Sequence, residues 1–215
     1  MVVLLLVLLA GPVRAQEPSA PPLAVSRSPV GAWARYRTAH FGGSGGQDVR
    51  LALVARDARQ AIWELSLAGP DGQPVVVALT FRRGGSGLTG TLQGRAVQIG
   101  GGQPMQLQLD PAGPAFRELK RDPRARREAV VVPAGRFHCQ HHRMALDPGH
   151  GFDFWIAPGL FPTGVVRFEA WTRGGNGVRL VQETWELAAR GRGARPAVTR
   201  PAASFDREAF ARQFR

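Results

Sequence analysis

One segment in the second half of the chain, residues 129–171, constrains the fold more than any other. It opens with the β-branched run Val130–Val132, which ends at the turn sequence Pro133-Ala134-Gly135. The residues that follow are too rich in His, Phe and Arg to give a helix one apolar face, and Asp147-Pro148-Gly149-His150-Gly151 then reverses the chain. Short runs separated by turns predict a meander of antiparallel strands.

Residues 136–146 of this segment hold three of the five histidines and the only cysteine. A strand places successive side chains on opposite faces. One face would carry Phe137, Cys139, His141, Arg143 and Ala145. The other would carry His138, Gln140, His142, Met144 and Leu146. We expect Cys139 and His141 to lie in the interior and His138 and His142 to face water.

Apolar and polar residues alternate in the same way through the rest of the chain. Further candidate strands are residues 31–38, 49–54, 63–67, 75–81, 89–99, 105–109, 152–156, 165–171 and 178–188. In the last of these we place Val181, Trp185 and Leu187 on one face. Short alternating strands broken by glycine and proline predict an all-β, mostly antiparallel fold. We expect a curved half-barrel or a β-sandwich, with one face in water.

The chain divides into four parts by composition. We assign residues 1–15 to a signal peptide, 16–28 to a disordered lead, 29–189 to a single β domain, and 190–215 to a basic linker with a short C-terminal helix. Ser204 would cap that helix, which we place at Phe205–Phe214. Inside the β domain, Ala115–Lys120 is expected to form a helical turn and Asp122–Arg127 a basic surface loop.

The first residues predict export. Val2–Leu9 is an unbroken apolar run, and Val13 and Ala15 stand at the −3 and −1 places of a small-residue cleavage site. The run is too short to cross a bilayer as a helix of the mature protein. We therefore expect a cleaved signal peptide and a periplasmic or secreted protein. A retained membrane anchor is the alternative.

A longer pattern spans the central segment. It consists of a valine run, P-A-G, a phenylalanine and H-x-R, followed after a hairpin by W-I-x-P and P-x-G-V-V-R-F-E. The matching residues are Val131–Gly135, Phe137, His141, Arg143, Trp155–Pro158 and Phe161–Glu169, with Val30–Tyr36 matching a V-G-x-W-x-x-Y opening strand. This pattern resembles that of an uncharacterised family of periplasmic and envelope proteins of Gram-negative bacteria. The resemblance implies a strongly curved antiparallel sheet, like the half-barrel of periplasmic lipoprotein carriers, and no particular reaction.

The chain is strongly basic, with a net charge of +12, and its basic residues are almost all arginine, since Lys120 is the single lysine. This arginine preference is typical of a GC-rich genome. Attraction to an anionic membrane surface or to polysaccharide is the second interpretation. We do not expect a nucleic-acid partner, because the chain carries no recognisable nucleic-acid module. The oligomeric state is left open.

No catalytic set emerges from the sequence. Cys139 and His141 share one strand face and His138 and His142 share the other, whereas zinc needs three or four converging ligands. A metal-binding protein or enzyme centred on His138–His142 is therefore only an alternative hypothesis. Gly42–Gly46 fits G-x-S-x-G around Ser44, but strands flank it on both sides, and the nucleophile elbow requires a helix after the serine. We assign no cofactor and no metal site.

Aromatic residues lie along several of the candidate strands. A curved sheet could hold an apolar ligand in its concavity, and we assign the ligand-binding role to Trp33, Trp63, Phe154, Trp155 and Phe168. The function that the sequence favours is therefore a non-enzymatic envelope protein that binds a lipid-like or other apolar ligand. A structural scaffold without a small ligand is the alternative, in which these aromatic residues fill a core. Arg143, Arg167 and Glu169 are expected to form ion pairs on the wet face.

Overall fold

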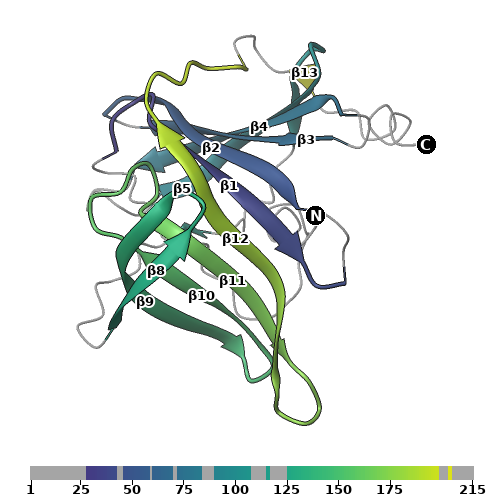
Figure 1. Ribbon diagram of the computed structural model, residues 1–215. Helices are drawn as coiled ribbons and strands as arrows, with labels where there is room; N and C mark the ends of the chain where they lie inside the picture. Colours follow the sequence, from purple (N-terminus) through teal and green to yellow (C-terminus); the bar gives the residue numbers. More distant parts are fainter. Residues whose placement is uncertain are drawn as a thin grey trace.

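In a computed structural model, the chain forms one curved sheet, with no helix among the residues that the structure describes (Figure 1). These residues are 28–42, 46–58, 60–69, 72–83, 90–107, 115–116, 125–198 and 203–204. The strands are β1 (Trp33–His40), β2 (Gln47–Arg56), β3 (Gln60–Ala68), β4 (Pro74–Arg83), β5 (Gly90–Ile99), β6 (Met105–Leu107), β7 (Ala115–Phe116), β8 (Arg126–Val132), β9 (Gly135–Asp147), β10 (His150–Ile156), β11 (Val165–Arg173), β12 (Arg179–Gly191) and β13 (Ala203–Ser204).

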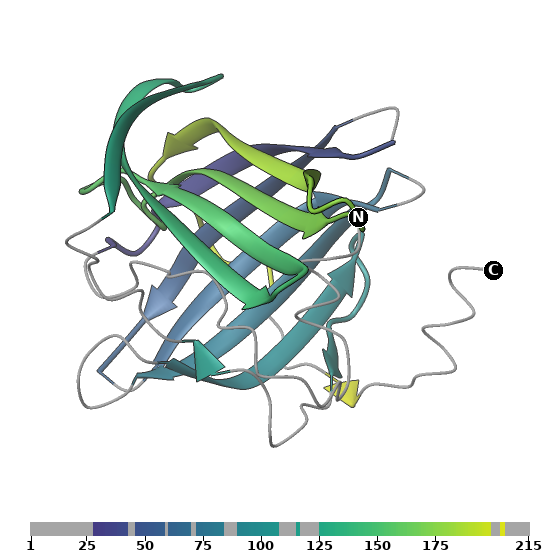
Figure 2. The same ribbon diagram turned by 90° about the horizontal axis from the view of Figure 1, so that it is seen from below.

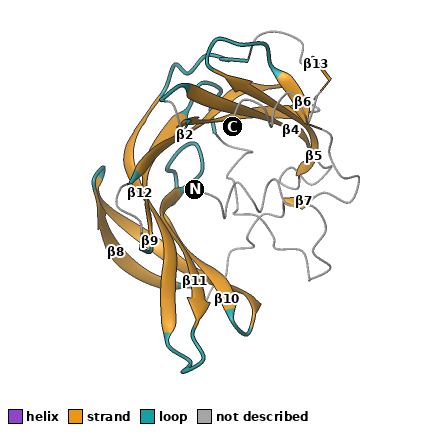
Figure 3. Cartoon of the chain, turned by 90° about the vertical axis from the view of Figure 1, so that its right-hand side faces the viewer, coloured by secondary structure: helices purple, strands orange, loops and turns teal. Residues whose placement is uncertain are grey.

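The strand order is β13-β6-β5-β4-β3-β2-β1-β12-β11-β10-β9-β8, with β7 paired to β5. Every pairing is antiparallel except that of β13 with β6. β1 pairs with both β2 and β12, so the first strand joins the two halves of the sheet. The predicted all-β, antiparallel fold is confirmed, and of the two predicted architectures the structure has the single curved sheet. Figure 3 shows this sheet as an open arch.

The arch has an inner and an outer face. We call inner the face that carries Tyr36, Leu53, Trp63, Phe154 and Phe168, which the strand registers place on one side of the sheet. These side chains belong to two clusters of buried apolar residues, one over β2–β5 and the other centred on β9–β12. Trp185 of β12 packs against both clusters. The inner face is therefore apolar across the junction between the two halves.

The β8–β9 hairpin curls the opposite way, over the outer face of β11 and β12 (Figures 2 and 3). Its turn is attached to β12 by the Ala134 N–H, which donates to the Leu187 carbonyl at 3.0 Å. The Trp155 indole N–H of β10 donates to the Glu128 carboxylate of β8. Val130, Val132 and Cys139 are buried inside this curl. The β8–β9 hairpin thus gives the sheet a second curvature, opposite to that of the arch.

This reversal corrects one prediction. Cys139 is buried and His138 is exposed, as expected, but His142, predicted to face water, is only 8% exposed. His142 lies opposite Phe154 on the inner face, whereas His141 lies opposite Trp155 on the outer face. The physical reason is that β9 takes part in both curvatures, so both of its faces contribute to an interior.

Polar side chains attach two connecting segments to the sheet. The Glu64 carboxylate of β3, only 4% exposed, accepts hydrogen bonds from the Ala197 and Val198 N–H groups at 2.9–3.0 Å, which fixes the segment after β12 across the outer face. The Tyr36 hydroxyl is 2.7 Å from the Thr163 hydroxyl and donates to the Val165 carbonyl. Burial raises the pKa of Tyr36, so this phenol stays protonated.

Some predicted segments differ from the structure or lie outside it. Ala115 and Phe116, the start of the expected helical turn, form strand β7, and Arg126 and Arg127, the end of the expected loop, begin β8. The predicted disordered lead ends at Ser28, which is buried, with its hydroxyl donating to the Pro162 carbonyl. The signal peptide, the rest of that lead, Ser44 and the C-terminal helix lie outside the described residues. Ser204, expected to cap that helix, instead pairs with β6 as part of β13.

Candidate functional site

The five residues predicted to bind a ligand fall on both faces of the sheet. Trp63, Phe154 and Phe168 lie on the inner face, where they are at most 4% exposed. Trp33 and Trp155 lie on the outer face. The Trp33 indole donates to the Arg192 carbonyl at 3.2 Å, and Arg50 stacks over its ring at 5.3 Å. The structure therefore places three of the five on the inner face, where Phe154 and Phe168 are in contact and Trp63 belongs to the other apolar cluster, and the other two make outer-face contacts.

A connected row of aromatic rings crosses the inner face from β10 to β1. Phe168 is 5.2 Å from Phe154 and 6.2 Å from Trp185, measured between ring centroids, and Trp185 is 6.0 Å from Tyr36. Phe152 adds a further ring 5.4 Å from Phe168. These tilted and edge-on contacts are the geometries that aromatic pairs prefer. The row continues into the cluster of β2–β5 through Trp185.

Two buried polar atoms on this apolar face lack a hydrogen-bond partner among the described residues. One is the indole N–H of Trp63, a residue that is 0% exposed. The other is Oε2 of Glu183, a residue of β12 that is 4% exposed. The second oxygen of Glu183 accepts from the Trp185 indole N–H at 2.6 Å and lies 4.0 Å from His40 Nδ1. The inner face is thus apolar with two unsatisfied polar atoms.

The outer face of the same strands carries a network of ion pairs. Asp153 of β10 is fully buried and accepts two hydrogen bonds from Arg143 at 3.0 and 3.2 Å and one from Arg179 at 2.5 Å. Arg179 also donates to Glu169 at 2.9 Å, and Arg167 lies 2.6 Å from Glu169. The expected ion pairs are therefore present only in part: Arg167 pairs with Glu169, but on the same strand, whereas Arg143 pairs across strands with Asp153, and both carboxylates are buried rather than on a wet face.

Arg143 and Arg179 keep the Asp153 carboxyl group ionised. Burial alone would raise the pKa of this carboxyl, but the hydrogen bonds from Arg143 and Arg179 outweigh it and lower the pKa. A carboxylate held ionised by three charged hydrogen bonds is a poor proton acceptor. On this face Arg167 Nε, Arg179 Nε and Trp171 Nε1 have no hydrogen-bond partner within the described part of the chain, yet both guanidinium groups are engaged through their other nitrogens. The network thus ties β9, β10, β11 and β12 together through charged hydrogen bonds.

The histidine segment does not converge on one point. His141 stacks on Trp155 at 4.4 Å, and its ring nitrogens lie 3.3 Å from Glu128 and 3.2 Å from Asp153. The approach to Asp153 is short, but its angle is too poor for a hydrogen bond, so we count it as proximity only. In the described part of the chain, no group of three or more His, Cys, Asp or Glu residues could hold a metal ion. This geometry gives the metal hypothesis no support.

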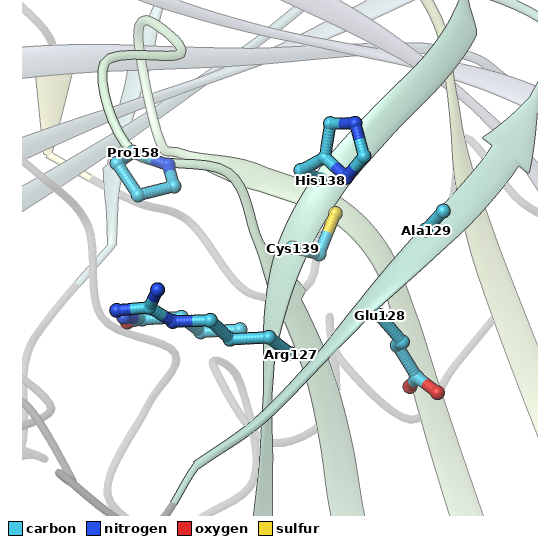
Figure 4. A pocket seen from close by; sticks show the side chains of 7 residues that line it. Arg127, Glu128, Ala129, His138, Cys139 and Pro158 are labelled. Atoms are coloured by element: carbon cyan, nitrogen blue, oxygen red, sulfur yellow. The ribbon is translucent and has the colours of Figure 1, made fainter.

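An open pocket of about 690 Å³ lies beside the β8–β9 hairpin (Figure 4). Its lining consists of Arg127, Glu128, Ala129, His138, Cys139, Gln140 and Pro158, and contains none of the predicted ligand-binding residues. Burial and the nearby Glu128 carboxylate raise the pKa of Cys139 to about 11. The thiol therefore stays protonated near neutral pH and is a weak nucleophile.

Sequence reasoning counted Trp185 among the tryptophans that could line the concavity, and the structure places it on the inner face, but it missed Tyr36 and Glu183 there. Tyr36 shares that face because the strand register pairs it with Leu187, which the sequence alone does not show. The burial of Glu183 had no sequence signal, since a lone glutamate in a strand is usually solvated. The chain forms, within its described part, no helix with the length and hydropathy needed to cross a membrane.

No family model and no curated protein matches this chain. Among solved structures, it is similar to a proposed exported protein of Bacteroides fragilis with a YmcC-like fold, at 10% identity and a TM-score of 0.39, over 80% of this chain and 100% of that one. A proposed lipoprotein of Parabacteroides distasonis gives 11% identity and a TM-score of 0.40 over the same shares. MucB gives 13% and 0.34, over 81% of this chain and 56% of MucB. No site residue is carried over from these proteins.

Proposed function

We propose that this chain is an exported, non-enzymatic protein of the cell envelope that binds a lipid-like ligand against the inner face of its curved sheet. The observation that carries the proposal is the continuous apolar and aromatic inner face, which runs from β4 across β1 to β10 on one side of an open arch. Concave, mostly apolar surfaces with a few polar groups are typical of small-molecule sites.

The Trp63 indole supports the same proposal. A buried N–H without an acceptor costs about 1–3 kcal/mol, and the described residues offer it none. A ligand oxygen at this depth would accept that hydrogen bond, while the acyl chain would contact Leu53 and Leu79, which belong to the same cluster. Recognition would then combine an extended apolar contact with a single polar contact.

Export is supported by the apolar run Val2–Leu9 and the small residues Val13 and Ala15 that follow it. A net charge of +12 favours attraction to anionic lipid surfaces, which would bring the protein close to its ligand. The absence of catalysis is supported by the charged groups of the outer face, where Asp153 is occupied by Arg143 and Arg179. We expect a binding function without turnover.

The test uses the mature protein and dodecanol, an uncharged probe with a twelve-carbon chain. Titration followed by tryptophan fluorescence should saturate with one site. Trp63→Phe keeps an aromatic ring but removes the unpartnered N–H, and we expect about tenfold weaker binding, the equivalent of one lost hydrogen bond. Trp33→Phe on the outer face is the matched control and should bind as the wild type does.

Two outcomes would contradict this proposal. The first is no saturable binding of dodecanol to folded protein, and the second is binding weakened by Trp33→Phe and unaffected by Trp63→Phe. A scaffold without a ligand is the competing function, and the burial of Leu53, Trp63 and Phe154 supports it as well. Native mass spectrometry of protein isolated from its own compartment separates the two, because a carrier retains an added lipid mass and a scaffold shows only the polypeptide.

A further inference from the structure

Glu183 is the one carboxylate that the described strands place on the inner face. The strand register sets it opposite Ala170 of β11 and His40 of β1, two residues along β12 from Trp185. The remaining strand carboxylates that the structure describes lie on the outer face or at strand ends, and Asp153, Glu169 and Glu186 among them are each within 3.6 Å of a guanidinium nitrogen. Glu183 has no arginine within ion-pairing distance among the described residues.

The surroundings of Glu183 leave one of its carboxylate oxygens without a donor among the described residues. Oε1 accepts from the Trp185 indole at 2.6 Å, and His40 Nδ1 lies 4.0 Å from that same oxygen. Oε2 is buried and has no donor within the described residues. Burying an ionised oxygen without a hydrogen bond is unfavourable, so this position demands a donor.

The strongest partner for a carboxylate in an apolar setting is a positively charged donor. The site is bounded by the aromatic row of Trp185, Phe168 and Tyr36, so the donor would have to sit at the end of an apolar body. An amphiphile with a primary ammonium head group meets both conditions. An amphiphile with a carboxylate or phosphate head group meets only the second condition, since its head group would be repelled by Glu183.

We propose that Glu183 is the head-group recognition residue of the inner face, and that it selects long-chain amines over long-chain acids. This inference rests on the proposed lipid-binding function and names its ligand class. It runs against the overall electrostatics, because a net charge of +12 by itself attracts anions. The Glu183 carboxylate therefore predicts a preference for amines, whereas the net charge predicts a preference for acids, and a binding experiment can distinguish the two.

The experiment compares dodecylamine, dodecanol and dodecanoic acid, each below its micelle-forming concentration, by fluorescence titration of the mature protein. We expect dodecylamine to bind at least tenfold more tightly than dodecanoic acid. Glu183→Gln should reduce that ratio about tenfold and leave dodecanol binding unchanged. Glu186→Gln is the matched control, because Glu186 lies on the same strand, faces outward and pairs with Arg167. It should preserve the ratio.

The outcomes separate the two proposals. Equal affinity for amine and acid, or tighter binding of the acid, would overturn the role of Glu183 while leaving apolar binding in place. No binding of any of the three probes would overturn the proposed function itself. If Glu183→Gln fails to fold by circular dichroism, the amine-to-acid ratio of the wild type still decides, and Glu183→Asp, which keeps the charge, should retain an amine preference.

Discussion

The two faces of β10, β11 and β12 are made by the same strands and stabilised in different ways. The inner face packs Phe154, Phe168 and Trp185 by non-directional apolar contact and leaves Glu183 with an unpartnered oxygen. The outer face surrounds Asp153 with arginines. The outer face pairs its buried carboxylates with arginines, whereas the inner face, to which we assign the proposed ligand, leaves one carboxylate oxygen without a donor among the described residues.

The largest effect is expected from the inner face. Phe154→Ala removes a fully buried ring that contacts Phe152 and Phe168, so it loses apolar burial and leaves a cavity. We expect a loss of about 3–5 kcal/mol in the free energy of unfolding, measured by urea denaturation. Phe41→Ala is the control, because Phe41 is 70% exposed and its truncation should cost under about 0.5 kcal/mol. Similar losses for both variants would show that the inner face is not a packed interior.

The outer face should give the next largest effect. Asp153→Asn removes the buried charge that pairs with Arg143 and Arg179, and we expect a loss of about 3 kcal/mol at pH 7. Asp48→Asn is its control: the Asp48 side chain is 51% exposed, lies 3.6 Å from Arg35, and should contribute under about 1 kcal/mol. An Asp153→Asn variant as stable as the wild type would mean that the network is dispensable.

The ion pairing of Asp153 with Arg143 and Arg179 also predicts how the free energy of unfolding changes with pH. The pKa of Asp153 is lowered in the folded protein from its ordinary value of 3.8, so the unfolded chain binds this proton more readily. The stabilisation is therefore fully present above about pH 4 and is lost as the pH falls toward the folded-state pKa. The stability difference between wild type and Asp153→Asn should narrow between pH 7 and pH 3. A difference that stays constant would show that the charge of Asp153 is not its cause.

Alternation in steps of two predicted the strands and failed where the sheet changes shape. It placed Val181 on one face with Trp185 and Leu187, but a register shift after Ala170 sets Val181 opposite Trp171, on the outer face. A bulge inserts one extra residue into a strand, so the side chains beyond it face the opposite side of the sheet. The local sequence does not show where this bulge occurs. His142 was misassigned because β9 lies between two curvatures. Both errors arise from tertiary geometry, which also decides which aromatic residues face inward.

The smallest effect comes from Gly151, which allows a tryptophan to cover the outer face. A Cβ at Gly151 of β10 would lie 2.3 Å from the Trp171 ring and 2.5 Å from the Met144 carbonyl oxygen. Since the backbone contact cannot be relieved by a rotamer change, we expect Gly151→Ala to cost about 1–3 kcal/mol in urea denaturation. Gly149→Ala, in the same hairpin, is the control, because its Cβ would meet only Asp147 Oδ1 at 3.5 Å. Equal stability of the two variants would mean that Trp171 does not lie over β10. In that case the Trp171 ring would not stack with Arg179, and this contact would not help to hold the Arg179 guanidinium beside Asp153.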